Sequence, residues 1–162
     1  MDNPFTPTEH AAWGGLLGTF GTMSAIIDAD LQKRFGLSHV EFEVLLRLAT
    51  SPTGRLRIHD LAARSILTRS GMSRAVERLE RAGYLTRERA PEDRRGAYAS
   101  LTDDGRRRSE LVAAEHVAFV REHFLSLFSE KELQQMAGLW DRVSARAGTG
   151  AGPTTTLKGS RA

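Results

Sequence analysis

The sequence predicts a mainly α-helical fold with one small β-hairpin. Through most of the 162 residues, apolar side chains recur every three or four positions, which is typical of amphipathic helices. Residues 84–89 and 97–101 are strand-like and flank a polar segment, 90–96, that reads as a hairpin loop. We expect a single domain over residues 8–147, between an extended arm (1–7) and a disordered tail (148–162) rich in Gly and Thr.

The first two helices are bounded by recognisable capping residues. We expect the first helix over residues 8–34, with Thr8 as its N-cap and Gly36 as its stop. Its apolar positions form one wide face: Trp13, Leu16, Leu17, Phe20, Met23, Ile27 and Leu31. Ser38 and Glu41 have the spacing of a capping box, so a second helix should begin there and end at the turn formed by residues 51–54.

Residues 57–101 have the element order of a winged helix-turn-helix. A short helix at about 57–64 precedes a helix at about 68–82, and the two predicted strands follow. In such a unit, the first helix braces the second, which can enter the major groove of DNA.

Two further helices complete the chain. Thr102, followed by two acidic residues, should start a helix over about 103–128, in which Gly105 carries a mild propensity cost. Ser129 and Glu132 form a third capping signal and open a helix to about residue 147. Together with helix 8–34, these helices carry more apolar surface than a small winged-helix core can bury, so their aromatic residues need partners. The alternative is that these aromatic residues pack within one chain. For Phe20 and Phe119, the sequence favours the two alternatives equally.

Charge is distributed unevenly along the chain. Residues 55–108 contain 14 arginines and eight acidic residues, whereas the rest of the chain contains nine bases and 12 acids. A basic centre between acidic flanks indicates a polyanionic partner for the centre.

Helix 68–82 has both a face for packing and a face for contacts with DNA. Met72, Ala75, Val76 and Leu79 form the apolar stripe. The candidates for major-groove and phosphate contacts are Thr68, Arg69, Ser70, Ser73 and Arg74. The alternative for Arg74 and Glu77 is an ordinary solvated surface. We expect Arg78 and Arg81 to contact phosphate, pair with acids or face water rather than read bases.

The loop of the hairpin supplies a second candidate contact. Arg94 and Arg95 at its tip can enter a narrow minor groove, where the negative potential attracts arginine. Asp93 should orient a nearby arginine such as Arg89 or Arg95. The alternative is a charged turn that only faces solvent.

The chain resembles the MarR family of bacterial transcriptional regulators over about residues 8–147. The stretches that carry the resemblance are EFEVL (41–45), DLA (60–62), SGMSRAVERLERAGYL (70–85), DRRG (93–96), which matches the family's Asp-x-Arg wing signature, and LTDDG (101–105). The resemblance implies a homodimer on a near-palindromic operator in double-stranded DNA. Helices 8–34 and 103–147 would be its dimerisation helices, with Trp13, Phe124, Phe128 and Trp140 at the interface.

The resemblance also implies release from DNA by a small ligand, often aromatic or anionic. The ligand would bind between the dimerisation helices and the winged unit, near Trp13, Phe20, His39 and Arg47. A tryptophan on an apolar helix face is more often a core or interface residue, so this assignment has a simpler alternative.

Several other functional classes are excluded or disfavoured. The absence of cysteine excludes disulfides, thiolate metal sites and thiol-based redox sensing. His116 and His123 are expected to be solvated helix residues rather than zinc ligands, so we predict no metal and no cofactor. No nucleophile elbow or phosphate-cradling loop suggests an enzyme. The N-terminus is unlike a signal peptide, and no apolar run could span a bilayer, so a cytoplasmic location without membrane contact is expected.

The sequence therefore predicts a sequence-specific, DNA-binding transcriptional regulator that acts as a repressor. The alternative is a winged-helix module used for nonspecific DNA architecture or for contacts with other proteins.

Overall fold

The computed structural model describes residues 4–63, 69–90 and 93–146, with side chains described except at 62–63, 69–70 and 93–95. The predicted mainly helical fold with a small antiparallel sheet is confirmed. The elements, in chain order, are α1 (Pro7–Phe35), α2 (His39–Thr50), β1 (Arg55–Arg57), α3 (Ile58–Ala63), α4 (Arg69–Arg81), β2 (Leu85–Ala90), β3 (Asp93–Leu101), α5 (Asp103–His123), the 3-10 helix η1 (Leu125–Leu127) and α6 (Glu130–Arg146).

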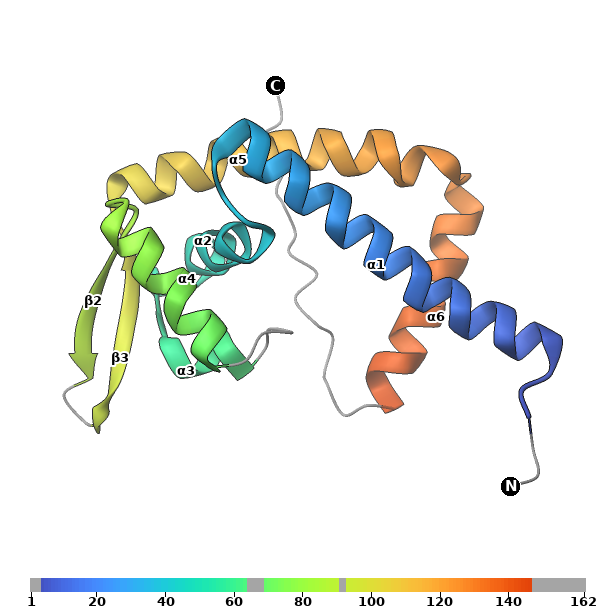
Figure 1. Ribbon diagram of the computed structural model, residues 1–162, viewed down its shortest axis with the longest axis horizontal. Coiled ribbons are helices and arrows are strands. Elements are labelled where there is room, and N and C mark those ends of the chain that lie inside the picture. The colour runs from blue at the N-terminus through green and yellow to red at the C-terminus, as the bar shows by residue number, and fades with distance from the viewer. Residues whose placement is uncertain (1–3, 64–68, 91–92, 147–162) are drawn as a thin grey trace.

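The molecule has two parts. Figure 1 shows α2, α3, α4 and the sheet grouped at one end, with α1 and α5 extending from that group toward α6 at the other. We call residues 39–101 the winged core, and we call α1, α5, η1 and α6 the helical frame. Among the described residues, no helix combines the length and apolar composition needed to cross a membrane.

Local capping signals determine where the first two helices begin and end. The Thr6 hydroxyl accepts a hydrogen bond from the Glu9 amide at 3.3 Å, and the Glu9 carboxylate accepts one from the Thr6 amide at 2.8 Å. Thr6, not the predicted Thr8, is therefore the N-cap of α1, and Pro7 occupies the first helical position, where its missing N–H costs nothing. The predicted stop at Gly36, with φ of 65°, and the capping box of Ser38 and Glu41 are confirmed.

The hydrophobic core lies where α2 packs against α4 and α5. Phe42, Val44, Leu45 and Leu48 of α2 are buried, as the helical periodicity requires of a central helix. They form one cluster with side chains from α1, α3, α4, the sheet and α5, namely Leu31, Leu61, Met72, Val76, Leu79, Leu85, Ala99 and Val112.

The sheet differs from the prediction in two ways. Its order is β1-β3-β2, and β1, which pairs with residues 98–100, was not predicted because a three-residue strand has no readable period. Helix α3 accordingly begins at Ile58 rather than at residue 57. The predicted loop 90–96 is also wrong, because β2 extends to Ala90, which pairs with Asp93 at the start of β3. Exposed hairpin strands tolerate charged side chains, so polarity alone did not mark the loop.

The helical segment that follows the sheet is interrupted at Phe124. The predicted continuous helix to Phe128 is wrong: α5 ends at His123, Phe124 adopts φ of −134°, and η1 follows. The Ser126 hydroxyl donates a hydrogen bond to the Glu122 carbonyl at 2.8 Å, a local bond that competes with helical pairing. Ser129 and Glu132 then cap α6, as predicted.

Candidate nucleic-acid interface

Helix α4 presents two chemically different faces. Its apolar stripe, Met72, Ala75, Val76 and Leu79, is buried against the core as predicted. Ser73 and Arg74 are exposed on the outer surface, together with Glu77. The other predicted contacts cannot be placed as side chains: Arg69 and Ser70 lie in the first turn of α4, but only their backbone is described, and Thr68 lies outside the described residues.

The wing is a two-stranded ribbon beside α4. Arg89 is exposed on β2, and its backbone pairs with Ala97. Asp93, Arg94 and Arg95 are the first three residues of β3 rather than part of the predicted loop, and their side chains are outside the described part of the structure. The expectation that Asp93 orients a neighbouring arginine therefore remains a prediction.

An ion-paired arginine connects the wing to α4. Arg87 of β2 lies 2.5 Å from the Glu80 carboxylate and 4.0 Å from that of Glu77. The pairs cross from strand to helix, so they help fix the wing relative to α4. Sequence reasoning missed this contact because no local spacing relates a strand residue to the preceding helix.

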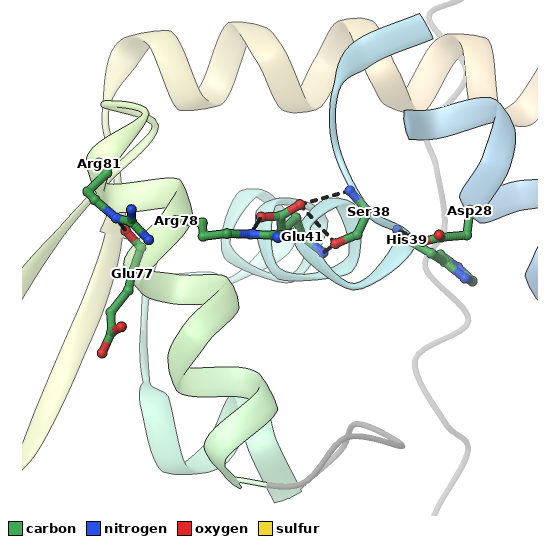
Figure 2. Close-up of polar contacts among 7 residues, drawn as sticks. All are labelled: Asp28, Ser38, His39, Glu41, Glu77, Arg78 and Arg81. Atoms are coloured by element: carbon green, nitrogen blue, oxygen red, sulfur yellow. Dashed lines mark hydrogen bonds and ion pairs between the residues drawn. The ribbon is translucent and has the colours of Figure 1, made fainter. Parts of the chain in front are cut away.

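The same C-terminal part of α4 is also tied to the start of α2 (Figure 2). The Arg78 Nε donates a hydrogen bond to Glu41 Oε1 at 2.7 Å. The other carboxylate oxygen, Oε2, accepts from the Ser38 amide and from the Ser38 hydroxyl, both at 2.8 Å. Burial would raise the pKa of Glu41, but the hydrogen bonds from Arg78 and Ser38 outweigh it and hold that pKa below its ordinary value. Pairing with an acid was one of the options that the sequence left open for Arg78.

Two arginines of the edge strand β1, Arg55 and Arg57, lie beside Tyr98 of β3. The Arg55 guanidinium lies 3.9 Å from the centroid of the Tyr98 ring, and Arg57 Nε donates to the Tyr98 hydroxyl at 3.2 Å. These contacts place two arginines beside the base of the wing. They were not predicted, because β1 itself was not.

An apolar groove separates α1 from the C-terminal part of the frame. Its volume is about 650 Å³, and none of the described residues that line it carries a charged side chain. The residues that line it include Leu16, Phe20, Met23, Val120, Phe124, Phe128, Met136 and Trp140. Three of the four predicted interface aromatics are in this list. The fourth, Trp13, does not line the groove, but its side chain is 53% exposed on α1.

The residues of the predicted ligand pocket are not gathered at one place. Phe20 lines the apolar groove, whereas Trp13, His39 and Arg47 do not. The His39 amide donates to Asp28 Oδ1 at 2.7 Å, and Arg47 pairs with Glu43 and donates to the Leu61 carbonyl. Arg47 thus contributes to the winged core.

The two histidines of α5 have separate environments. His116 is not the solvated residue that was predicted: its ring packs 5.0 Å from that of Phe42, and burial together with the nearby His39 lowers its pKa. His123 is exposed and stacks on Phe119 at 4.1 Å. Within residues 4–63, 69–90 and 93–146, no three His, Asp or Glu side chains gather in a way that could hold a metal ion.

Comparison with known proteins places this geometry in context. The model of the MarR family matches residues 35–96. The chain is 33% identical over 138 residues to the HTH-type transcriptional regulator PecS of Dickeya dadantii, covering 79% of each protein. It is 30% identical over 125 residues to an HTH-type transcriptional regulator of Bacillus cereus, covering 76% of this chain and 81% of that one.

Solved structures agree over nearly the whole chain. AbsC, a MarR family transcriptional regulator from Streptomyces coelicolor, superposes with a TM-score of 0.79 at 32% identity, covering 90% of this chain and 97% of that one. Sco3205, from the same organism and family, was solved in complex with DNA. It has a TM-score of 0.79 at 34% identity and covers 90% and 91% of the two chains.

Proposed function

Because the chain belongs to the MarR family of DNA-binding transcriptional regulators, we propose that it is a homodimeric repressor that recognises a near-palindromic operator and releases it when a small ligand binds. As a regulator of this family it acts by binding DNA and is not an enzyme. The observation that carries the proposal is the division of α4 into a buried apolar stripe and an exposed polar face.

The proposed reading surface combines α4 with the wing. Ser73 and Arg74 are exposed on α4, Arg69 and Ser70 lie in its first turn, and Thr68 precedes the helix in the sequence, outside the described residues. We assign these five residues to the major groove and to flanking phosphates, since serine and arginine side chains can bond both. Arg94 and Arg95 of β3 are assigned to the minor groove, with Asp93 and Arg89 orienting the wing. Sco3205, the related regulator solved with DNA, supports a DNA-binding role for this fold.

Homodimerisation is supported by the apolar surface of the helical frame. Trp13 and Trp140 are 53% and 45% exposed, and among the residues described in α6 none is buried. Phe124 and Phe128 face the apolar groove beside α1. An apolar surface of this kind is expected to be covered by another protein surface, and a second copy of the frame offers matching aromatic residues.

Ligand-controlled release is supported by the size of the groove. A volume of about 650 Å³ lies within the range of small-molecule pockets. Because its described lining is apolar and includes the rings of Phe20, Phe124 and Trp140, an aromatic ligand suits it better than an anionic one. Of the residues first predicted for the ligand, Phe20 is the one that the groove supports, and Trp13, His39 and Arg47 lie elsewhere.

The test is a footprint of the protein on the DNA that flanks its own gene, followed by titration against bulk genomic DNA. A sequence-specific regulator should protect two half-sites about 10 base pairs apart and bind them at least about 1,000-fold more tightly than bulk DNA. Arg74→Ala should relax the base preference while the dimer, measured by sedimentation, is retained. A specificity ratio near one would overturn the proposal and favour nonspecific DNA architecture.

A further inference from the structure

We infer that Arg78 is a positioning residue for operator recognition: its ion pair with Glu41 sets the orientation of α4 against α2, and thereby the angle at which the reading face meets the groove. The inference rests on the proposed role of α4 as the reading helix. It assigns to Arg78 a function through another residue rather than a contact with bases.

The first argument is the environment of Glu41. The residue is 4% exposed, yet its carboxylate keeps its charge because each oxygen has a defined donor. Oε2 accepts from the Ser38 amide and hydroxyl and so caps α2, which leaves Oε1 to Arg78 Nε at 2.7 Å. A buried carboxylate held in this way has little freedom, so the guanidinium that binds it is fixed as well.

The second argument is the direction of the side chains on α4. Figure 2 shows Arg78 directed toward Glu41 at the start of α2, whereas Glu77 points away from α2 and Arg81 folds back along α4, where its Nε donates to the Glu77 carbonyl at 3.4 Å. Arg78 is one turn beyond Arg74 of the reading face, and its side chain remains 56% exposed. Its Nε is therefore engaged by Glu41 at a position where an arginine could otherwise extend toward phosphate.

The third argument is that the segment carrying Glu41, the start of α2, is itself fixed. The start of α2 is also attached to α1, because the His39 amide donates to Asp28 Oδ1 at 2.7 Å. The contact from α4 thus ends on a point that is itself fixed to the helical frame. At the wing side, α4 is held by the ion pairs of Arg87 with Glu80 and Glu77. These pairs and the buried apolar stripe of α4 remain when the Arg78 contact is lost, so we expect a small tilt of α4 against α2.

A small tilt should affect specific and nonspecific binding differently. Hydrogen bonds to base edges need a donor and an acceptor within a few tenths of an ångström and good alignment. Attraction to the phosphates depends on net charge and tolerates a changed angle. A positioning role therefore predicts a loss of specificity, whereas a direct phosphate contact by Arg78 predicts a uniform loss of affinity.

The experiment compares two duplexes with four variants. The probes are a 40-base-pair duplex selected by the wild-type protein from a random library and a scrambled duplex of equal composition. The variants are R78Q, E41Q, the double variant E41Q/R78Q and, as a matched control on the same helix, R81Q. Dissociation constants are measured from 50 to 200 mM salt, and thermal unfolding is followed by circular dichroism.

We expect R78Q and E41Q each to weaken binding to the selected duplex about tenfold or more, with less than about a threefold change on the scrambled duplex and an unchanged salt slope. The double variant should be no worse than the poorer single variant, because the two groups act as one pair and two amides leave no buried charge. R81Q should change binding to both duplexes equally.

Other outcomes overturn the inference. If R78Q lowers the salt slope by about one per protomer while E41Q binds like the wild type, Arg78 contacts phosphate directly. Because a charge-removing variant can unfold, R78K is measured as well: it keeps the charge but lacks the Nε donor, so it should lose specificity with an unchanged salt slope. An R78K with the wild-type specificity ratio overturns the positioning role. If the wild-type protein itself does not distinguish the duplexes, the proposed function fails instead.

Discussion

Helices α2 and α6 are both amphipathic, yet they are in opposite situations. Five of the 12 residues of α2 are buried, whereas none of the 17 residues of α6 is. The apolar face of α2 meets α4 and α5 of the same chain, while α6 presents Leu139, Trp140 and Val143 to solvent. Apolar periodicity thus indicates that a helix face will be covered, but it does not tell which chain covers it.

The same contrast extends to the two parts of the molecule. The winged core has its large apolar side chains inside and, apart from Glu41, its described charged side chains at least partly exposed, so its stability should depend on its own packing. The helical frame leaves large apolar side chains exposed, so substitutions of these side chains should change the association of two chains rather than the folding of one. Four predictions test this contrast, from the largest expected effect to the smallest.

Truncating a core residue should have the largest effect on the free energy of unfolding. Leu45 is fully buried in α2, so Leu45→Ala removes buried surface and leaves a cavity. We expect a loss of about 2–5 kcal/mol, measured by urea unfolding. The matched control is Leu127→Ala in the frame, where the side chain is 71% exposed and the loss should be small. Equal losses in the two variants would contradict the contrast.

A smaller loss of unfolding free energy is expected for a substitution at Gly105, where the winged core and the helical frame meet. A Cβ at Gly105 would lie 1.8 Å from the Tyr84 carbonyl oxygen, so the first turn of α5 packs directly on the turn before β2. The glycine is therefore required by close packing and is not the mild propensity cost that we predicted. Gly105→Ala should cost about 2 kcal/mol, because overpacking outweighs the gain in helix propensity.

The control for this prediction is a glycine without a close neighbour. At Gly138 of α6, no atom of the described residues lies within 4 Å of an added Cβ, so Gly138→Ala should be neutral or stabilising by up to about 1 kcal/mol. Thermal unfolding of both variants measures the difference. A Gly105→Ala protein as stable as the wild type would show that the start of α5 can move away from the winged core.

An interface substitution should change association rather than folding. Trp140 lines the apolar groove and is 45% exposed, so Trp140→Ala should leave the helical content of the chain intact. If a second copy covers the groove, the dimer should weaken by about 1–2 kcal/mol, roughly 5- to 30-fold in its dissociation constant. Sedimentation over a concentration series measures this, and an unchanged dimer would remove Trp140 from the interface.

How far the sequence predicts this structure depends on the range of each signal. The stop at Gly36 and the capping boxes of Ser38 and Ser129 are complete within four residues, and they were predicted correctly. The stripe of α4 was predicted because its period is local. The first cap was misplaced because Pro7 reads equally well as an extended arm or as a helix start.

The contacts that join the elements could not be predicted in the same way. Arg78 and Glu41 are 37 residues apart, and Arg57 and Tyr98 are 41 apart. No spacing rule relates such pairs until the fold brings them together. The packing of His116 against Phe42 was missed for the same reason, since the helical position of a histidine does not reveal what the neighbouring helix places beside it.

That histidine gives the smallest of the four effects. Burial, and then the nearby His39, lowers the pKa of His116 below its unfolded value of about 6.5. A group whose pKa is lowered by folding favours the folded state above the unfolded pKa, and this contribution is lost as the pH falls through the folded pKa. The melting temperature should therefore decline from about pH 6.5 downward, and His116→Gln should decline less steeply. His123→Gln, an exposed histidine of the same helix, is the matched control and should follow the wild type. If His116→Gln also follows the wild type, protonation of His116 does not limit the stability of the α2–α5 contact at low pH, and the winged core is held there by its apolar packing alone.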